Sequence, residues 1–410
     1  MSRFMRLNTK TLLLLYILSL VGIVNAEETS RERLIKTIIL ENGFTYSKEL
    51  YLEVDAHLSA EGKGFFESKH LSLNGEIACV TCHNAKSGSS DGIPNAAGIG
   101  GYGKGIDRLY SGAKIVPRNS LALWGVGSKG FNTLFWDGKL IFLKDKTISQ
   151  FGSTAPSSDP LITAVHLPAV EIRETLEEDS FIAQHKKENA AGSEIIYNAI
   201  TANLKKNEPD LMSSLAAKKN MSIADIRFLD VASAIAAFIR DEFRIKKTRL
   251  EAFVLSEEGL TKTELRGAEI FYGKGGCSSC HSGGNFTDQK FYTVPFPQLG
   301  FGKNGFGIDY GRYNATFNPI DLYKFRTPSL YNVEITSPYG HSGSVATLSQ
   351  AIVAHFDPLK LVDISQYDSL QRHEFSKVMT KSDMVGKVNY LTEDEVSALT
   401  VFLKTLSFKK

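Results

Sequence analysis

Cysteine is scarce in this sequence, which contains only four cysteines in 410 residues. All four lie in two pentapeptides of one pattern, CVTCH at residues 79–83 and CSSCH at residues 277–281. No pair of cysteines is left over to form a disulfide elsewhere in the chain. The thiols are instead concentrated beside two histidines that follow them directly.

The sequence also has no apolar run that is long enough to span a membrane. The run at residues 12–24 falls short of the ~20 residues that a membrane-spanning helix needs. Basic residues precede it, and the small-residue site Val-Asn-Ala follows at residues 24–26. This pattern is typical of a secretory signal peptide. We therefore expect residues 1–26 to be cleaved near Ala26, and the mature chain to be exported to the periplasm without a membrane span.

The chain has no marked excess of charge of either sign. It contains 47 basic and 45 acidic residues, and loss of residues 1–26 would remove three of the basic residues and none of the acidic ones. No basic run favours binding to nucleic acid or to a membrane surface. The remaining chain is long enough for two domains with a core each.

Each pentapeptide matches a c-type haem attachment site. Thiols three positions apart on one tight turn can add to the two vinyl groups of a porphyrin, and the adjacent histidine can reach the iron as proximal ligand. A redox-active CxxC pair needs no histidine there, and a zinc ion bound by both cysteine pairs would leave both histidines unexplained. We therefore expect two covalently bound haem c groups. The residues that hold them would be Cys79, Cys82, His83, Cys277, Cys280 and His281.

Similar surroundings of the two pentapeptides indicate an internal duplication. Each follows a segment with helical signals and precedes a loop rich in glycine and asparagine, and a related element comes later, PRNSL at residues 117–121 and RTPSL at residues 326–330. The sequence predicts a mainly α fold of two c-type cytochrome domains, with long loops wrapped around two covalent haems. We place the domains at residues 27–246 and 247–410, with the charged stretch 240–249 as the linker.

Capping signals predict four helices. Ser59 is expected to open a helix ahead of the first pentapeptide, and Thr261, in a capping box, a helix ahead of the second. Ser222 is expected to cap a long helix with one apolar face, and Thr392 a last helix near the C-terminus. Strand signals are few and short.

Several further strings resemble the bacterial di-haem cytochrome c peroxidase and MauG family over nearly the whole mature chain. They include PRNS at 117–120, FWDG at 135–138, NFTD at 285–288, DYGR at 309–312 and TSPYGH at 336–341. In that family one haem meets hydrogen peroxide, the other handles electrons, and a tryptophan lies between them. The resemblance implies that the peroxide haem is on His83, the electron haem on His281, and the bridging residue is Trp136. A buried core aromatic is the alternative role for Trp136.

The resemblance also implies which groups move protons at the peroxide haem. Glu171, in the sequence LPAVE, matches the family's distal glutamate, with Glu174 as the alternative, and Gln150 matches its distal glutamine. The spacing from Trp136 to Glu171 is longer than in the family, because residues 144–166 hold an insertion.

A calcium site is implied in the same way. Asn119 matches the family's side-chain calcium ligand, and Thr336 and Pro338 match its two backbone carbonyl ligands. Oxygen donors from distant chain segments suit Ca²⁺, with water completing the shell.

Two features depart from typical peroxidases of the family. Those enzymes close the resting peroxide haem with a histidine in the following loop, but residues 84–108 contain no histidine. We therefore expect this haem to be open at rest. At the other haem, His355 stands where peroxidases place methionine and MauG places tyrosine, so we expect it to be the second axial ligand. Met379 and Met384 are the next candidates.

Both departures favour the MauG side of the family. Imidazole in place of a thioether should lower the potential of the electron haem, and an open peroxide haem needs no prior reduction. The chain is therefore expected to use hydrogen peroxide to oxidise aromatic side chains of a periplasmic partner protein. The alternative is a cytochrome c peroxidase that takes electrons from a small cytochrome or cupredoxin. A pure electron-transfer cytochrome is the third possibility, and an open haem argues against it.

Overall fold

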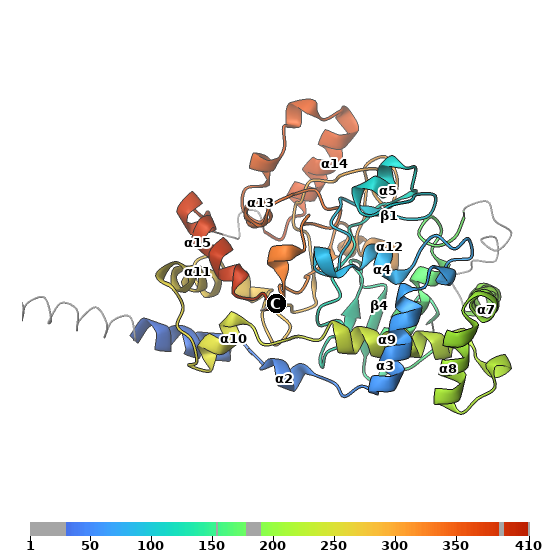
Figure 1. Ribbon diagram of the computed structural model, residues 1–410. Helices are drawn as coiled ribbons and strands as arrows, with labels where there is room; N and C mark the ends of the chain where they lie inside the picture. Colours follow the sequence, from blue (N-terminus) through green and yellow to red (C-terminus); the bar gives the residue numbers. More distant parts are fainter. Residues whose placement is uncertain (1–29, 153–154, 178–189, 385–388, 409–410) are drawn as a thin grey trace, which may run out of the picture.

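The computed structural model describes residues 30–152, 155–177, 190–384 and 389–408 (Figure 1). The expected signal peptide lies outside these residues. The protein is mainly helical, and its first helix spans residues 30–41. The other α-helices are α2 (Ser47–Leu50), α3 (Ala56–Glu67), α4 (Cys79–Cys82), α5 (Ile106–Tyr110), α6 (Pro160–His166), α7 (Ala190–Asn207), α8 (Pro209–Lys219), α9 (Phe228–Glu242), α10 (Arg249–Val254), α11 (Lys262–Tyr272), α12 (Tyr313–Thr316), α13 (Leu348–Val353), α14 (Ser369–Thr380) and α15 (Glu393–Lys404).

The strands are short and all their pairings are antiparallel. In the described residues, β1 pairs with β2, β4 lies between β3 and β5, and β6 pairs with β7. The strands are β1 (Ala96–Ala97), β2 (Ile115–Val116), β3 (Thr133–Leu134), β4 (Leu140–Leu143), β5 (Lys146–Ser149), β6 (Phe291–Tyr292) and β7 (Phe325–Arg326). Within the described part of the chain, no helix has the length and apolar character that crossing a membrane requires.

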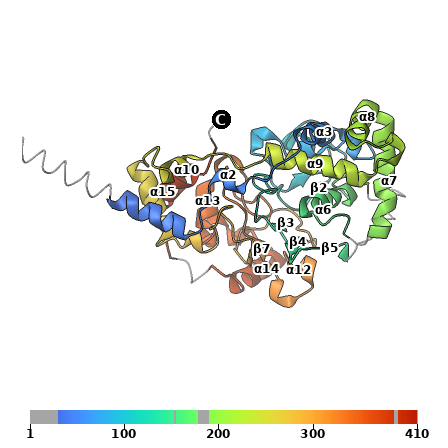
Figure 2. The ribbon, with the colours of Figure 1, turned by 90° about the horizontal axis from the view of Figure 1, so that it is seen from below.

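Buried apolar side chains form two main clusters. The first surrounds the packing of α3 against α9, and the second surrounds the packing of α11 against α15. Figure 2 shows α9 and α15 toward opposite ends of the molecule, with loops and short strands between them. The segments that connect the two clusters are therefore mostly irregular chain.

Both helix packings depend on a glycine in the helix that precedes a CxxCH motif. A β-carbon at Gly62 of α3 would clash with the carbonyl oxygen of Ala234 in α9, and one at Gly267 of α11 would clash with the carbonyl oxygen of Ala398 in α15. Glycine lets the two backbones approach this closely because it has no side chain. A close helix–helix contact at a glycine thus recurs ahead of each motif.

Two of the four expected helix starts are confirmed. The hydroxyl of Thr261 accepts a hydrogen bond from the backbone N–H of Glu264, and α11 follows. The hydroxyl of Thr392 does the same for Glu395, and α15 follows. Both are capping boxes, in which the glutamate in turn accepts from the N–H of the threonine.

The other two starts were placed wrongly. α3 begins at Ala56 and not near Ser59, because the carboxylate of Asp55 accepts the backbone N–H groups that open the helix. Ser222 caps only a short 3-10 turn, and α9 begins later, at Phe228. A serine with an acidic residue shortly after it therefore did not identify the first turn of either helix.

Candidate functional site

The first CxxCH motif lies on α4 and the residue that follows it. Cys79 and Cys82 begin and end this single helical turn, and both thiols are free. Burial lowers the pKa of His83, so its ring is neutral near pH 7. Its Nδ1 lies 3.0 Å from the carbonyl oxygen of Ser89. A carbonyl oxygen only accepts, so Nδ1 carries the proton and donates it, which leaves Nε2 free to bind a metal ion.

The second motif repeats this arrangement on a 3-10 turn. Cys277 and Cys280 are free, and Nδ1 of His281 lies 3.2 Å from the carbonyl oxygen of Phe286. Burial, and secondly the nearby His355, lowers the pKa of His281 to about 4. The ring is therefore neutral, and its Nε2 is the free nitrogen.

A cavity of about 450 Å³ lies beside the second motif. Cys277, Cys280, His281 and His355 all line it. His355 lies two residues after the end of α13, and its Nδ1 lies 2.8 Å from the carbonyl oxygen of Ala351, so its Nε2 is also free. Met384 lines the cavity as well, whereas Met379 is not among its lining residues. The volume is in the range of about 300–1,000 Å³ that is usual for cofactor sites.

These residues fit a covalently attached haem at each motif. Each offers two free thiols for the vinyl groups and a neutral imidazole with a free Nε2. In the described part of the chain, no three His, Cys, Asp or Glu side chains are grouped to hold a metal ion. All four cysteines belong to that part, and the structure does not bring the two pairs together.

The segment that carries Glu171 and Glu174 lies beside the first motif. The backbone N–H of Ile99 donates to the carbonyl oxygen of Arg173 at 3.1 Å, which ties this segment to the loop after the motif. Burial, and secondly the charge of Glu174, raises the pKa of Cys79 to about 12. Both candidate glutamates therefore lie near the site where the first haem would attach.

Glu171 forms an ion pair with Lys139, whose Nζ donates to its Oε1 at 2.9 Å. Burial alone would lower the pKa of Lys139, but the charges of Glu171 and Asp137 raise it. Lys139 therefore stays charged and favours the ionised form of Glu171. An ionised carboxylate is the form that can accept a proton from a bound substrate.

Gln150 lies near Lys139 because of the pairing of β4 with β5. Leu140 of β4 is paired with Ser149 of β5, so Lys139, just before β4, and Gln150, just after β5, lie at the same end of the strand pair. Its Nε2 is buried and has no hydrogen-bond partner among the described residues. Buried polar groups are normally satisfied, so this amide is a donor without an acceptor.

Trp136 lies between the two motifs. Its ring lines the cavity of His281 and His355, and its Nε1 donates to the carbonyl oxygen of Asn119 at 2.9 Å. The next residue, Ser120, donates through its hydroxyl to the carbonyl oxygen of Cys82 at 2.9 Å. One side chain thus touches the wall of the second cavity and a segment bound to the first motif.

Trp124 shares this placement, which the sequence did not indicate. It lines the same cavity, and its Nε1 donates to the carbonyl oxygen of Gly88 at 2.9 Å. Gly88 precedes Ser89, whose carbonyl oxygen holds the ring of His83. The chain contains only two tryptophans, and both lie between the motifs.

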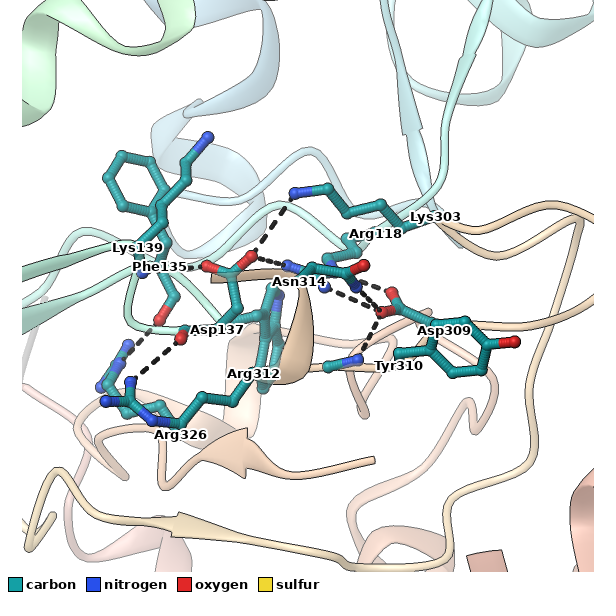
Figure 3. A network of polar contacts seen from close by, with 12 residues as sticks. Arg118, Phe135, Asp137, Lys139, Lys303, Asp309, Tyr310, Arg312, Asn314 and Arg326 are labelled. Carbon is teal, nitrogen blue, oxygen red and sulfur yellow. Dashed lines mark hydrogen bonds and ion pairs between the residues drawn. The ribbon is translucent and has the colours of Figure 1, made fainter. Parts of the chain in front are cut away.

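A buried ionic network joins the two halves beside Trp136 (Figure 3). Arg118 donates to Asp309 through Nε at 2.7 Å and Nη2 at 2.8 Å, and to Asp137 through Nη1 at 2.7 Å. Burial alone would raise the pKa of Asp137, but the charges of Arg118, Lys303 and Lys139 hold it well below its usual range. Arg118 and Asp137 thereby fix the residues that flank Asn119 and Trp136.

The expected calcium ligands also lie together. Thr336 and Pro338 line the cavity, and Nδ2 of Asn119 donates to the carbonyl oxygen of Pro338 at 2.6 Å. Oδ1 of Asn119 is buried without a hydrogen-bond partner in the described chain. A half-turn of the amide would exchange this hydrogen bond for an Oδ1 that faces the Pro338 carbonyl oxygen. In that orientation, the amide and carbonyl oxygens would be of the kind that binds Ca²⁺.

Comparisons with known proteins indicate the family to which the chain is related. The family model for di-haem cytochrome c peroxidase, CCP_MauG, matches residues 57–259. The chain is 29% identical over 322 residues to the cytochrome-c peroxidase IdrP1 of Denitromonas iodatirespirans, a match that covers 72% of this chain and 70% of that protein. It is 27% identical over 299 residues to the methylamine utilization protein MauG of Methylorubrum extorquens, with 72% and 67% covered. Its fold is similar to that of the diheme peroxidase BthA from Burkholderia thailandensis, with a TM-score of 0.62, 20% identity and 89% of each chain covered.

Proposed function

Because this chain belongs to the di-haem cytochrome c peroxidase and MauG family, we propose that it reduces hydrogen peroxide with electrons from a small cytochrome or cupredoxin. The names of the relatives support this activity better than the MauG-like oxidation of a partner protein that the sequence favoured. The observation that carries the proposal is the ion pair of Glu171 and Lys139 beside the first motif, with the unpartnered Gln150 at the same end of the β4–β5 pair as Lys139.

Haem iron at the first motif would supply the site where peroxide binds and electrons are exchanged. His83 would hold the iron through Nε2, because Nδ1 is fixed by Ser89. Glu171 would accept a proton from one peroxide oxygen and deliver it to the other, which turns a poor leaving group into water. The Nε2–H group of Gln150 would donate to the bound oxygen and orient it.

His281 and His355 would hold the second haem, through which electrons enter. Both residues line one cavity and both have a free Nε2, which supports ligation by two imidazoles. This is also the observation that favours MauG-like oxidation of a periplasmic protein as a second candidate function. A haem with two imidazole ligands has a lower potential than one with a thioether, and is a weaker reservoir for the reducing electron.

The two candidates are distinguished by one assay series. The protein purified with both haems is mixed with hydrogen peroxide and reduced cytochrome c or a reduced cupredoxin, and oxidation of the donor is followed by absorbance. Rapid peroxide-dependent oxidation supports the peroxidase. If donors are not oxidised while a co-purified protein acquires oxygen atoms or cross-links, seen by mass spectrometry, the MauG-like function replaces it.

We also propose that the chain consists of two haem domains, residues 27–246 and 247–410, behind a signal peptide cleaved near Ala26. The close glycine packings at Gly62 and Gly267, each ahead of a motif, support a duplication. Intact mass of the exported protein tests the cleavage. Residues 247–410, made with the haem maturation system, should bind a single haem; failure to do so would contradict the division.

Replacing Cys79 and Cys82 together with alanine is expected to halve the haem content, leaving one haem per chain. The reason is that each thioether pair serves only its own porphyrin. Haem is counted by the pyridine haemochromogen spectrum after extraction with acidified acetone. Haem that acid acetone removes from the wild type would contradict covalent attachment, and the Cys277/Cys280 double variant is the matched control.

Replacing His355 with alanine is expected to convert the second haem from low-spin to high-spin. Loss of an axial imidazole weakens the ligand field, while His281 stays in place. Low-temperature EPR of the ferric protein measures the change. An unchanged low-spin signal would assign the position to Met384, which lines the same cavity, and Met384→Ala is therefore the companion variant.

Calcium is expected to bind at Asn119, Thr336 and Pro338. Removal with a chelator should perturb the cavity beside Trp136, because Asn119 accepts the indole N–H through its own carbonyl. Tryptophan fluorescence during calcium titration measures this. Asn119→Ala removes the side-chain oxygen and should abolish the response; a response that persists in this variant would place calcium elsewhere.

A further inference from the structure

Arg326 is a buried cation without an anion. Its side chain belongs to β7, the residue is 4% exposed, and burial lowers its pKa to about 10. Its Nε donates to the carbonyl oxygen of Phe135 at 3.0 Å and its Nη1 to that of Thr327 at 3.1 Å. Within the described chain, no carboxylate pairs with it, and its Nη2 makes no hydrogen bond. A buried charge that lacks a counter-ion is strongly unfavourable.

Neighbouring cations differ from Arg326 in this respect. Arg118 is paired with Asp137 and Asp309 (Figure 3). Arg312 faces Asp321 at 3.7 Å. Lys274 also lines the cavity of the second motif, but it is paired with Glu395 at 2.7 Å. Among the described lysines and arginines that line this cavity, Arg326 is thus the one without a carboxylate.

The missing anion can be supplied by the cofactor. Haem carries two propionate groups, and the planar guanidinium of arginine matches the geometry of a carboxylate. Arg326 lines the same cavity as Cys277, Cys280 and His281. We propose that Arg326 binds a propionate of the haem attached at Cys277 and Cys280. This inference rests on the proposed attachment of haem at that motif.

The same residue also holds the segment that carries Trp136. The backbone N–H of Arg326 donates to the carbonyl oxygen of Trp136 at 2.8 Å, beside the contact of its side chain with Phe135. Arg326 therefore ties a carboxylate of the second haem to the tryptophan between the two motifs. Its positive charge also raises the reduction potential of that haem, since it disfavours the more positive ferric form.

Two substitutions separate the charge of Arg326 from its contacts. Arg326→Gln keeps an N–H donor but removes the charge. Arg326→Lys keeps the charge but removes the planar guanidinium with its paired N–H donors. Lys324→Gln, two residues away and partly exposed, is the control for loss of one positive charge. Potentials are measured by optical spectroelectrochemistry, and the propionate bending band by resonance Raman spectroscopy, on protein that contains both haems.

Arg326→Gln is expected to lower the reduction potential of the second haem and to shift its propionate band. Arg326→Lys should keep the potential near that of the wild type. Lys324→Gln should change neither the potential nor the propionate band. Equal effects of the glutamine and lysine variants would show a purely structural role and overturn the proposal, as would an unchanged propionate band in both. Wild-type protein without haem at Cys277 and Cys280 would instead refute the proposed haem site, and the haem count made first reveals this.

Discussion

Replacing Glu171 with glutamine is expected to slow the reaction of the ferric protein with hydrogen peroxide by about 100- to 10,000-fold, the usual contribution of a positioned acid–base group. Glutamine has almost the same shape but cannot accept the peroxide proton. The ion pair with Lys139 is lost as well. Stopped-flow absorbance at the Soret band measures the rate. The resting spectrum should hardly change, because Glu171 is not proposed to bind the iron.

Glu174→Gln is the matched control, since the two carboxylates share one segment beside the first motif. If Glu174→Gln is the slow variant and Glu171→Gln reacts normally, the roles are exchanged.

Lys139→Met tests the ion pair with Glu171 separately. Without the cation, the carboxylate form of Glu171 loses its paired charge, so the acidic limb of the pH–rate profile should move to higher pH. A profile that stays in place would mean that Lys139 does not hold Glu171 ionised.

The sequence predicted those parts of the fold that depend on local chemistry. The capping boxes at Thr261 and Thr392 contain both of their partners within four residues, so they could be recognised directly. The start of α3 was missed because both Asp55 and Ser59 are good capping residues, and it is Asp55 that accepts the first backbone N–H groups. The close contact of Gly62 with α9 could not be foreseen, because it joins segments far apart in the chain.

The same distinction applies to the site. The cysteines and histidines of the two motifs are adjacent in sequence, and their spacing alone indicates haem. Lys139 was missed because its partner, Glu171, is 32 residues away. Arg118 and Asp309 are 191 residues apart, although each lies in a string that matches the family. Charge pairing across such distances depends on the folded arrangement of loops, which carry no periodic pattern.

Replacing Trp136 with phenylalanine is expected to abolish electron exchange between the two haem sites while peroxide still binds at the first. The indole is far easier to oxidise than a phenyl ring, and it spans from the wall of the second cavity to the Asn119–Ser120 segment. Rapid-mixing absorbance would then show that peroxide changes the bands of the first haem but not those of the second. Turnover with reduced cytochrome c should fall in parallel.

Trp124→Phe is the matched control, because Trp124 also lines the cavity and also donates its indole N–H to a backbone carbonyl, that of Gly88 in the loop after His83. Both substitutions remove an indole N–H that donates to a backbone carbonyl, so any general loosening of the structure should affect them alike. Thermal unfolding of both variants measures that loosening.

If only Trp136→Phe uncouples the haems, the route runs through the segment that Arg118 and Arg326 hold in place. If only Trp124→Phe does so, electrons pass instead through the Gly88 loop, and Trp136 is a packing residue. Coupling that survives in each single variant but fails in the double variant would mean that the two tryptophans are parallel paths, and would reject the single bridging residue implied by the family resemblance.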